Sequence, residues 1–265
     1  MNFTVLQAIF LGAVQGLTEL LPISSSAHLK ILPWLLWNID DIGAFDVALH
    51  AGTLLAIGIF FFKDWINLIV GAYKLTFKKE KNFEGKMFWY IVLATIPGGI
   101  IGFILDKFCG ELLMKPVIIA TALIVMGIIL YLVDKKSKST VKYEDMTLKQ
   151  TFLIGLSQAL AFIPGVSRSG ITMTTARAMG IERESAAKYS FMLSAPIVLA
   201  ATLFKLNEFV FSIPFFVGVL TSFVVGLLVI KFLLSYLQKG SFKAFAIYRI
   251  IFGLIIFAKI LFFMH

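Results

Sequence analysis

The sequence predicts an all-α membrane protein with about six spanning helices and two re-entrant helical hairpins, arranged as an inverted-topology repeat. Hydrophobic residues make up 59% of the chain and charged residues 15%, and the mean hydropathy is +0.93. Soluble domains average about 45–50% apolar and about 25% charged residues, so this composition excludes an ordinary soluble domain. We expect 1–265 to form a single transmembrane domain with repeat halves at about 1–133 and 148–265.

Six apolar stretches have or approach the length that spans a bilayer, which is about 20 residues. Four of them contain no charged residue. The stretch 44–62 contains Asp46 and His50, and the stretch 244–264 contains Arg249 and Lys259. The expected spans are therefore 44–62, 88–105, 116–133, 189–204, 209–230 and 244–264. The stretch 66–77 is too short to span comfortably and contains Lys74, so we expect it to be an interfacial or tilted helix.

Two further segments, 1–37 and 148–180, are apolar at their flanks but contain Pro, Gly, Ser and a charged residue in the middle. Non-helical backbone at membrane depth is tolerated only where protein buries it or where it lines a watery cavity. We therefore interpret both segments as re-entrant helical hairpins.

Lys and Arg are distributed unevenly over the two sides of this layout. The segments 63–86, 134–149, 177–188 and 231–243 together contain 17 of them, whereas the opposite side has 4. Because basic residues gather in cytoplasmic connections, the first side is predicted to be cytoplasmic. In this topology the first hairpin enters the membrane from outside and the second enters from the cytoplasm.

The two broken segments also resemble each other in sequence. At an offset of 143 positions, five residues of the first segment align with identical residues of the second: Gly12, Gln15, Leu17, Ser24 and Ser26 align with Gly155, Gln158, Leu160, Ser167 and Ser169. Interrupted helices at corresponding places in two halves indicate an inverted repeat with a site near the bilayer midplane. The alternative is a chance similarity between two helix breaks rich in Gly and Ser.

The first break contains an intramembrane carboxylate. Gln15 and Glu19 are four residues apart and share a helix face, and Pro22 ends that helix. A buried carboxylate in a membrane is costly and therefore indicates function, although a neutral or paired structural Glu19 is the alternative. Ser24, Ser25, Ser26 and His28 follow. His28 is a candidate base or nucleophile, with a packing role as its alternative.

The second break has the composition of an anion site. Gly165 and Gly170 allow tight turns that expose amide N–H groups, and a helix starting near Ile171 would direct its positive end into the loop. Arg168 adds a planar fork of donors suited to phosphate oxygens. Further hydroxyl donors are Ser167, Ser169 and Thr172. The sequence thus predicts an oxyanion cradle inside a membrane.

Other features exclude several classes of function. Cys109 is the only cysteine, so a disulfide framework and a cysteine-built zinc site are excluded. The sequence contains no P-loop, dinucleotide fingerprint or nucleic-acid motif, and we expect no nucleic-acid partner. His50 and Asp46 share a helix face, where a structural role is as plausible as a functional one. Arg249 is expected to be paired inside the protein.

At its two breaks the sequence resembles the undecaprenyl-pyrophosphate phosphatase family, the membrane enzymes associated with bacitracin resistance. The segment 15–28 is similar to the family's (Glu/Gln)-x-x-x-Glu and Pro-x-Ser-Ser-x-x-His patterns, and 164–172 matches Pro-Gly-x-Ser-Arg-Ser-x-x-Thr. The resemblance covers essentially the whole chain in length and span pattern. It implies hydrolysis of a C55 polyprenyl diphosphate to the monophosphate carrier lipid and inorganic phosphate. It also implies a bacterial plasma membrane enzyme whose site opens to the outer face.

By resemblance, the catalytic residues are Glu19, Ser25, His28 and Arg168, and the phosphate-binding residues are Ser24, Ser26, Gly165, Ser167, Arg168, Ser169 and Thr172. A divalent cation, Mg²⁺ or Ca²⁺, is implied as well, with Glu19 and Gln15 as its ligands. Many family members have Glu where this chain has Gln15, so one metal-binding charge is missing.

The sequence leaves the attacking group open among Ser25, His28 and a water molecule. Glu19 is expected either to orient the imidazole or to bind a metal. The expected partners are a polyprenyl diphosphate and the lipid bilayer, and the oligomeric state stays open, with a homodimer among the candidates. The alternative function is a secondary transporter or polyprenyl-phosphate flippase that uses the same anion site, because such proteins also have inverted repeats and broken helices.

Overall fold

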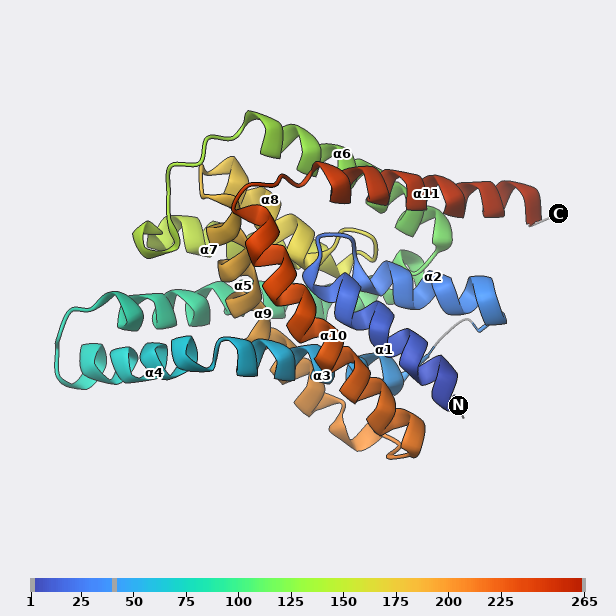
Figure 1. Ribbon diagram of the computed structural model, residues 1–265, viewed down its shortest axis with the longest axis horizontal. Helices are drawn as coiled ribbons and strands as arrows, with labels where there is room; N and C mark the ends of the chain where they lie inside the picture. The colour runs from blue at the N-terminus through green and yellow to red at the C-terminus, as the bar shows by residue number, and fades with distance from the viewer. Residues whose placement is uncertain (1–2, 40–41, 264–265) are drawn as a thin grey trace.

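The computed structural model describes residues 3–39 and 42–263, and this part of the chain is almost entirely helical (Figure 1). Its α-helices are α1 (Val5–Leu20), α2 (Ser25–Trp37), α3 (Ala44–Phe60), α4 (Phe62–Phe77), α5 (Phe83–Leu113), α6 (Pro116–Lys136), α7 (Leu148–Ser157), α8 (Arg168–Ala178), α9 (Arg183–Phe204), α10 (Ile213–Leu237) and α11 (Lys243–Phe263). Three short 3₁₀ segments are η1 (Tyr143–Asp145), η2 (Gln158–Phe162) and η3 (Leu206–Glu208). The predicted all-α class is confirmed.

Helix length and composition confirm a polytopic membrane protein. Among the described residues, 5 helices are long and apolar enough to cross a membrane, namely α5, α6, α9, α10 and α11. The pair α3 and α4 is the sixth candidate span, with a bend of 74° between the two helices. These elements correspond to the six stretches expected from the sequence, although the last expected residue, Met264, lies outside the described residues.

Helix α4 differs from the expected short interfacial helix at 66–77. It begins at Phe62, directly after Phe61, so α3 and α4 form one bent unit with no connecting loop. Helix α4 then packs along α5, where a Cβ on Gly85 would lie only 2.4 Å from the carbonyl oxygen of Gly71. Small residues allow this close approach of two helix backbones. Figure 1 shows the α4–α5 pair projecting from the rest of the molecule.

Several helices begin or end at different residues than the apolar stretches do. Helix α10 begins at Ile213 and not at 209, because the side chain of Ser212 caps it by accepting a hydrogen bond from the N–H of Phe215. Helix α9 extends back to Arg183, and α5 extends back to Phe83. A helix continues beyond its apolar part wherever polar residues can project into water. Hydrophobicity alone therefore does not mark the residue at which a helix begins or ends.

The two predicted hairpins are present as helix–break–helix units, and they have matching local geometry. Helices α1 and α7 both begin with a capping box, formed by Thr4 with Gln7 and by Thr147 with Gln150, again 143 positions apart. The helices after the breaks, α2 and α8, are capped by serines with positive φ, 77° at Ser24 and 70° at Ser167. The repeat therefore extends to backbone conformation.

The hairpins point in opposite directions, and their breaks meet in the interior (Figure 1). At the open end of the first hairpin, Phe3 stacks on Phe45 with the ring centroids 4.9 Å apart. At the open end of the second, the N–H of Thr140 donates to Gly180 O over 2.9 Å. Each helix of a hairpin has 10 to 16 residues, fewer than the roughly 20 needed to span a bilayer.

The four basic segments are connected to one another at one end of the molecule, three of them through a buried carboxylate. Asp134 at the end of α6 accepts hydrogen bonds from Arg177 at 2.9 Å, from Arg183 at 2.8 Å and from the N–H of Phe242 at 3.1 Å. Lys188 pairs with Asp64 of α4 over 2.7 Å. These contacts connect the segments 63–86, 134–149, 177–188 and 231–243, which were grouped by charge in the sequence.

Candidate active site

A cavity of about 240 Å³ lies where the two breaks meet α3 and α9. Its polar side is formed by Glu19, Ser25, Ser26, Asp46, His50, Gln158, Ser167 and Arg168. Its apolar side is formed mainly by Ala161, Phe162, Val47, Ile197, Val198 and Ala201. A cavity with one charged side and one apolar side suits an amphipathic ligand with an anionic head.

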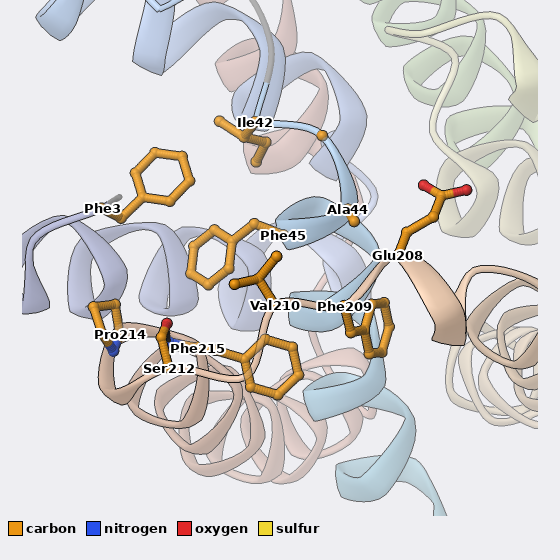
Figure 2. A pocket seen from close by; sticks show the side chains of 11 residues that line it. Phe3, Ile42, Ala44, Phe45, Glu208, Phe209, Val210, Ser212, Pro214 and Phe215 are labelled. Atoms are coloured by element: carbon orange, nitrogen blue, oxygen red, sulfur yellow. Dashed lines mark hydrogen bonds between the residues drawn. The ribbon is translucent and has the colours of Figure 1, made fainter. Parts of the chain in front are cut away.

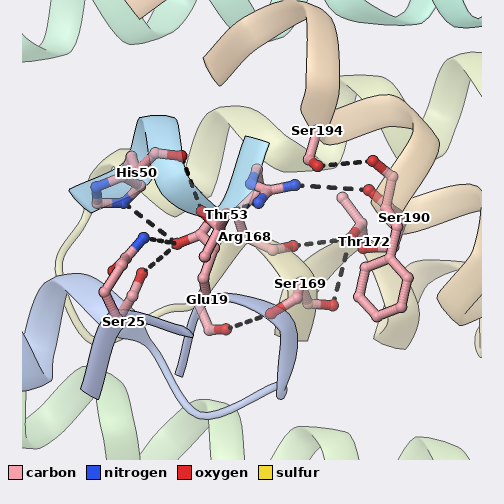
Figure 3. Close-up of polar contacts among 12 residues, drawn as sticks. Glu19, Ser25, His50, Thr53, Arg168, Ser169, Thr172, Ser190 and Ser194 are labelled. Atoms are coloured by element: carbon pink, nitrogen blue, oxygen red, sulfur yellow. Dashed lines mark hydrogen bonds and ion pairs between the residues drawn. The ribbon is translucent and has the colours of Figure 1, made fainter. Parts of the chain in front are cut away.

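Glu19 is the centre of the polar side, and four side chains contact its carboxylate (Figure 3). Arg168 forms an ion pair with Oε1. Oε2 accepts a 2.6 Å hydrogen bond from the hydroxyl of Ser25 and a 3.3 Å bond from the amide of Gln15, and Nε2 of His50 lies 3.2 Å away. Glu19 is 6% exposed, so it is a buried carboxylate with a hydroxyl donor and a cationic partner.

The N-termini of two helices meet at the cavity. Helix α2 begins at Ser25 and α8 begins at Arg168, and both residues line the cavity. Ser24 accepts from the N–H of Ala27 over 3.4 Å, and Ser167 accepts from Gly170 over 3.1 Å. The first N–H groups of a helix have no partner inside the helix, and the positive end of the dipole favours an anion. The arrangement can therefore bind phosphate oxygens.

Three of the predicted phosphate-binding residues, Ser24, Gly165 and Ser169, hold the two breaks together. The hydroxyl of Ser24 accepts from the N–H of Gly165 over 3.1 Å, and Ser169 donates to Leu21 O over 3.0 Å. Thr172 donates to Arg168 O over 2.7 Å and shares a 2.7 Å hydrogen bond with a serine of α9. The structure thus places Ser26, Ser167 and Arg168 at the cavity, and the others behind it.

Arg249 of α11 clamps the two breaks by donating hydrogen bonds to their backbone carbonyls, so its partners lie inside the protein. It donates to Pro22 O over 3.1 Å, to Gly165 O over 2.7 Å and to Val166 O over 2.9 Å. A 3.4 Å bond from its Nε to Leu123 O adds α6 to the contact. The side chain is 0% exposed. These carbonyls belong to irregular backbone and lack regular helix partners, and Arg249 supplies donors for them.

His28 lies away from the cavity. Its Nδ1 is 2.7 Å from Ser24 O and its Nε2 is 2.7 Å from the hydroxyl of Tyr248. The ring stacks on Phe252 with the centroids 4.4 Å apart. Both ring nitrogens already have partners and the residue is 2% exposed, so His28 packs α2 against α11 in this geometry.

His50 is the imidazole that the structure brings to Glu19, and sequence reasoning missed this pairing. Its spacing from Asp46 placed both residues on one face of a helix. That spacing contains no information about Glu19, because α1 and α3 meet only through the tertiary fold. The one available signal was the presence of two titratable residues within an otherwise apolar span.

Glu19 and Gln15 do not fit a divalent cation in this arrangement. Oε1 of Glu19 is paired with the Arg168 guanidinium, and Oε2 accepts from Ser25 and from the amide of Gln15. Mg²⁺ and Ca²⁺ take six or more oxygen ligands, whereas Oε1 of Gln15, a neutral oxygen, is the only side-chain oxygen of this pair without a hydrogen-bond partner. The guanidinium beside the Glu19 carboxylate also repels a cation. Among the residues whose side chains the structure describes, no group of three or more His, Cys, Asp or Glu forms a cation site.

A second cavity of about 280 Å³ lies near the starts of α3 and α10 (Figure 2). Its lining is mainly aromatic, with Phe3, Phe45, Phe209 and Phe215, and Glu208 is the only charged residue among the described residues of the lining. This described lining contains no basic residue. It does not have the groups that phosphate chemistry needs.

The fold and the first cavity define a class: a polytopic membrane protein that presents a serine–carboxylate pair, an arginine and two helix N-termini to an anionic group. The family model described as bacitracin resistance protein BacA matches residues 8–255. The chain belongs to this family.

Named relatives agree with the family assignment over almost their whole length. The undecaprenyl-diphosphatase of Pelotomaculum thermopropionicum is 48% identical over 255 residues, which is 95% of each chain. The undecaprenyl-diphosphatase of Caldicellulosiruptor bescii is 46% identical over 261 residues, 96% of this chain and 97% of its own. That of Moorella thermoacetica is 45% identical over 258 residues, with the same two shares.

Proposed function

We propose that this protein hydrolyses undecaprenyl diphosphate to undecaprenyl phosphate and inorganic phosphate, and so recycles the carrier lipid of cell-wall synthesis. The observation that carries the proposal is the meeting of Ser25, Glu19 and Arg168 at one cavity inside a membrane protein. The family and the names of the relatives support the same reaction.

The mechanism begins with charge neutralisation, because a diphosphate brings at least two negative charges into a site of low dielectric constant. Arg168 has five N–H donors, so it can bind phosphate oxygens as well as Glu19. The N-terminal amides of α2 and α8 supply further donors. Binding the terminal phosphoryl group here places its phosphorus next to Ser25.

Ser25 is the nucleophile that the geometry favours. Its hydroxyl already donates to Oε2 of Glu19 over 2.6 Å, so Glu19 can accept the proton as the serine oxygen attacks. A Ser25 Oγ–P bond forms, the P–O bond of the anhydride breaks, and undecaprenyl phosphate leaves. Glu19 gives its proton to the departing undecaprenyl phosphate, and its carboxylate then takes a proton from a water that attacks the phosphorus. The Ser25 Oγ–P bond breaks, phosphate leaves, and Glu19 returns the proton to Ser25 Oγ.

The apolar side of the cavity suits the isoprenoid tail. Phe162, Ile197, Val198 and Ala201 line it on η2 and α9. A tail that leaves the cavity between these elements stays in an apolar environment while the diphosphate lies among polar groups. This arrangement explains why a phosphatase for a membrane lipid has its site within the bilayer.

We further propose that the protein lies in the bacterial plasma membrane with its basic end cytoplasmic and its site open to the outer face. The uneven distribution of Lys and Arg supports this orientation. The first hairpin, which supplies Ser25 and Glu19, then enters from outside. Described residues of one chain supply every protein side chain in the mechanism.

A phosphate-release assay separates hydrolysis from the alternative, a polyprenyl-phosphate flippase. Detergent-purified protein has no second membrane face, so a flippase has nothing to transport, whereas a hydrolase releases phosphate. We expect one phosphate and one undecaprenyl phosphate for each diphosphate consumed. Intact undecaprenyl diphosphate after long incubation would refute the proposed hydrolase.

A further inference from the structure

We propose that Asp46 and His50 of α3 form a positioning pair that orients the carboxylate of Glu19 toward Ser25. This inference rests on the proposed phosphatase function and adds two residues to its machinery. Nε2 of His50 lies 3.2 Å from Oε2 of Glu19, the same oxygen that accepts the 2.6 Å hydrogen bond from Ser25. The shared oxygen is the acceptor for the serine proton.

The imidazole of His50 is itself held on its other side. Its Nδ1 lies 2.9 Å from Asp46 O and 3.2 Å from Asp46 Oδ1. Both ring nitrogens thus face oxygen acceptors, and the ring plane is fixed between α3 and the end of α1. Figure 3 shows the contact between His50 and Glu19 beside Ser25.

Glu19 needs such a partner because the last torsion of a glutamate side chain has a broad, roughly two-fold preference. Arg168 holds Oε1, but one contact leaves the carboxylate free to rotate about that point. The amide of Gln15 at 3.3 Å is the only other side-chain donor to Oε2 besides Ser25 and His50 among the described residues. His50 adds a contact from α3 to Oε2, so this oxygen stays beside the serine hydroxyl.

The position of Asp46 supports a polar role in the cavity. Asp46 and His50 both line it, and both come from an apolar helix in which polar side chains are costly. An i,i+4 pair on a water-exposed helix face stabilises the helix by only about 0.2–0.5 kcal/mol, which does not explain its presence here. Contact with the reacting carboxylate does explain it.

The test compares three single variants with the parent in phosphate release at saturating and limiting substrate. His50→Phe removes the donor, and we expect kcat to fall about 100-fold while KM stays within about threefold, because misplacing a reacting group by 1 Å can cost that much. His50→Gln keeps an N–H that can reach Oε2, and kcat should recover to within about tenfold of the parent. Asp46→Asn should lower kcat by about fivefold to tenfold.

The double variant His50→Phe/Asp46→Asn tests whether Asp46 acts through His50. We expect it to be no slower than His50→Phe alone, because removing His50 already removes the route to Glu19. Leu55→Phe, at an exposed position of the same helix, controls for general effects on α3 and should keep the parent kcat. The elution volume and the thermal unfolding midpoint show whether each variant is folded.

The outcomes separate this inference from the proposed function. A parent protein that releases no phosphate contradicts the phosphatase function itself. If the parent is active and the kcat of His50→Phe lies within twofold of the parent kcat, only the positioning pair is contradicted. Equal losses in His50→Gln and His50→Phe also overturn it, because an amide donor would then fail to replace the imidazole.

Discussion

Glu19 connects the two halves of the site, because its two carboxylate oxygens contact different hairpins and helices. Oε1 pairs with Arg168 of the second hairpin, whereas Oε2 accepts from Ser25 of the first. A carboxylate buried in this way loses its hydrogen bonds to water and accepts hydrogen bonds from protein donors in their place. Loss of a single partner leaves an uncompensated buried charge, so substitutions here affect activity strongly.

Arg168→Lys is expected to lower kcat/KM at least about 100-fold, because an ammonium cannot reproduce the planar fork that bridges Glu19 and phosphate oxygens. Phosphate release from undecaprenyl diphosphate measures the effect. Arg183→Lys is the matched control, since Arg183 pairs with Asp134 and does not line the cavity. Near-parent activity of Arg168→Lys would mean that the phosphate does not depend on the guanidinium.

The binding of a divalent cation can be tested without an activity assay. Because Arg168 and Ser25 already engage Glu19, substrate-free protein should bind Mn²⁺, used as a probe for Mg²⁺, no better than the Glu19→Gln variant does. Electron paramagnetic resonance of free Mn²⁺ measures this directly. A Mn²⁺ site present in the parent and lost in Glu19→Gln would show that the carboxylate exchanges Arg168 for a metal.

At the scale of single residues, the sequence predicted the neighbours of Glu19 only in part. Ser25 follows Glu19 within one short break, so their contact could be inferred from chain proximity. Arg168 was connected to them through the repeat, which indicated that both breaks form one site. His28 and His50 could not be distinguished in this way, because the direction of a side chain depends on the packing of α2 and α3.

At the scale of elements, the site depends on two irregular backbone segments held in contact. Gly165 has φ +97°, and a Cβ there would lie 2.5 Å from Ile119 O. Only glycine adopts this conformation readily and fits beside α6. Arg249 donates to carbonyls of both breaks, so α11 takes part in building a site that it does not line.

Arg249→Met should destabilise the protein, because three carbonyls of the breaks lose a charged donor in the interior. Hydrogen bonds to charged groups contribute about 1.5–3 kcal/mol each. A net loss of about 3 kcal/mol corresponds to a fall of roughly 6–12 °C in the unfolding midpoint of the detergent-solubilised protein. Scanning calorimetry measures it.

Lys259→Met in the same helix is the control for this substitution. Lys259 lies over the ring of Trp34 at 3.8 Å and does not contact the breaks. Its replacement should change the midpoint by only about 2–4 °C, as expected for the loss of one cation–π contact worth about 1 kcal/mol. If Arg249→Met is no less stable than Lys259→Met, Arg249 does not clamp the breaks.

Helix positions were predictable because apolar length is a strong signal in membrane proteins. The ends were less predictable, as α5 and α9 show. Arg183 and Glu184 begin α9 although they lie outside its apolar part. The start of α4 at Phe62 was also missed, because Lys63 and Asp64 interrupt the apolar pattern without interrupting α4. Helix propensity and hydrophobicity are different properties, and they diverge at polar residues.

At the scale of the whole molecule, two hairpins that open at opposite ends bring their breaks into contact. Ser24 and Ser167, 143 positions apart, cap α2 and α8 with the same unusual backbone conformation. This symmetry brings two helix N-termini to one cavity. The repeat in the sequence predicted that both breaks belong to one site, whereas only the helix N-terminus at the second break was expected.

The orientation in the membrane can be tested by cysteine labelling of intact cells in a Cys109→Ser background. Lys138 lies at the basic end, and Glu208 lies near the starts of α3 and α10 at the other end. We expect Glu208→Cys to react with an impermeant thiol reagent and Lys138→Cys to react only after the cells are opened. The reverse pattern would overturn the proposed orientation.

The central claim is that Ser25 and Glu19, joined by a 2.6 Å hydrogen bond, carry out phosphate release at the junction of the two breaks. The most direct test is the kcat of purified Ser25→Ala and Glu19→Gln with undecaprenyl diphosphate, beside Ser157→Ala as a control on α7. We predict that both site variants lose at least about 1000-fold in kcat, as for a removed nucleophile or base, while the control keeps parent activity. A folded Ser25→Ala or Glu19→Gln variant with activity within tenfold of the parent would contradict the account.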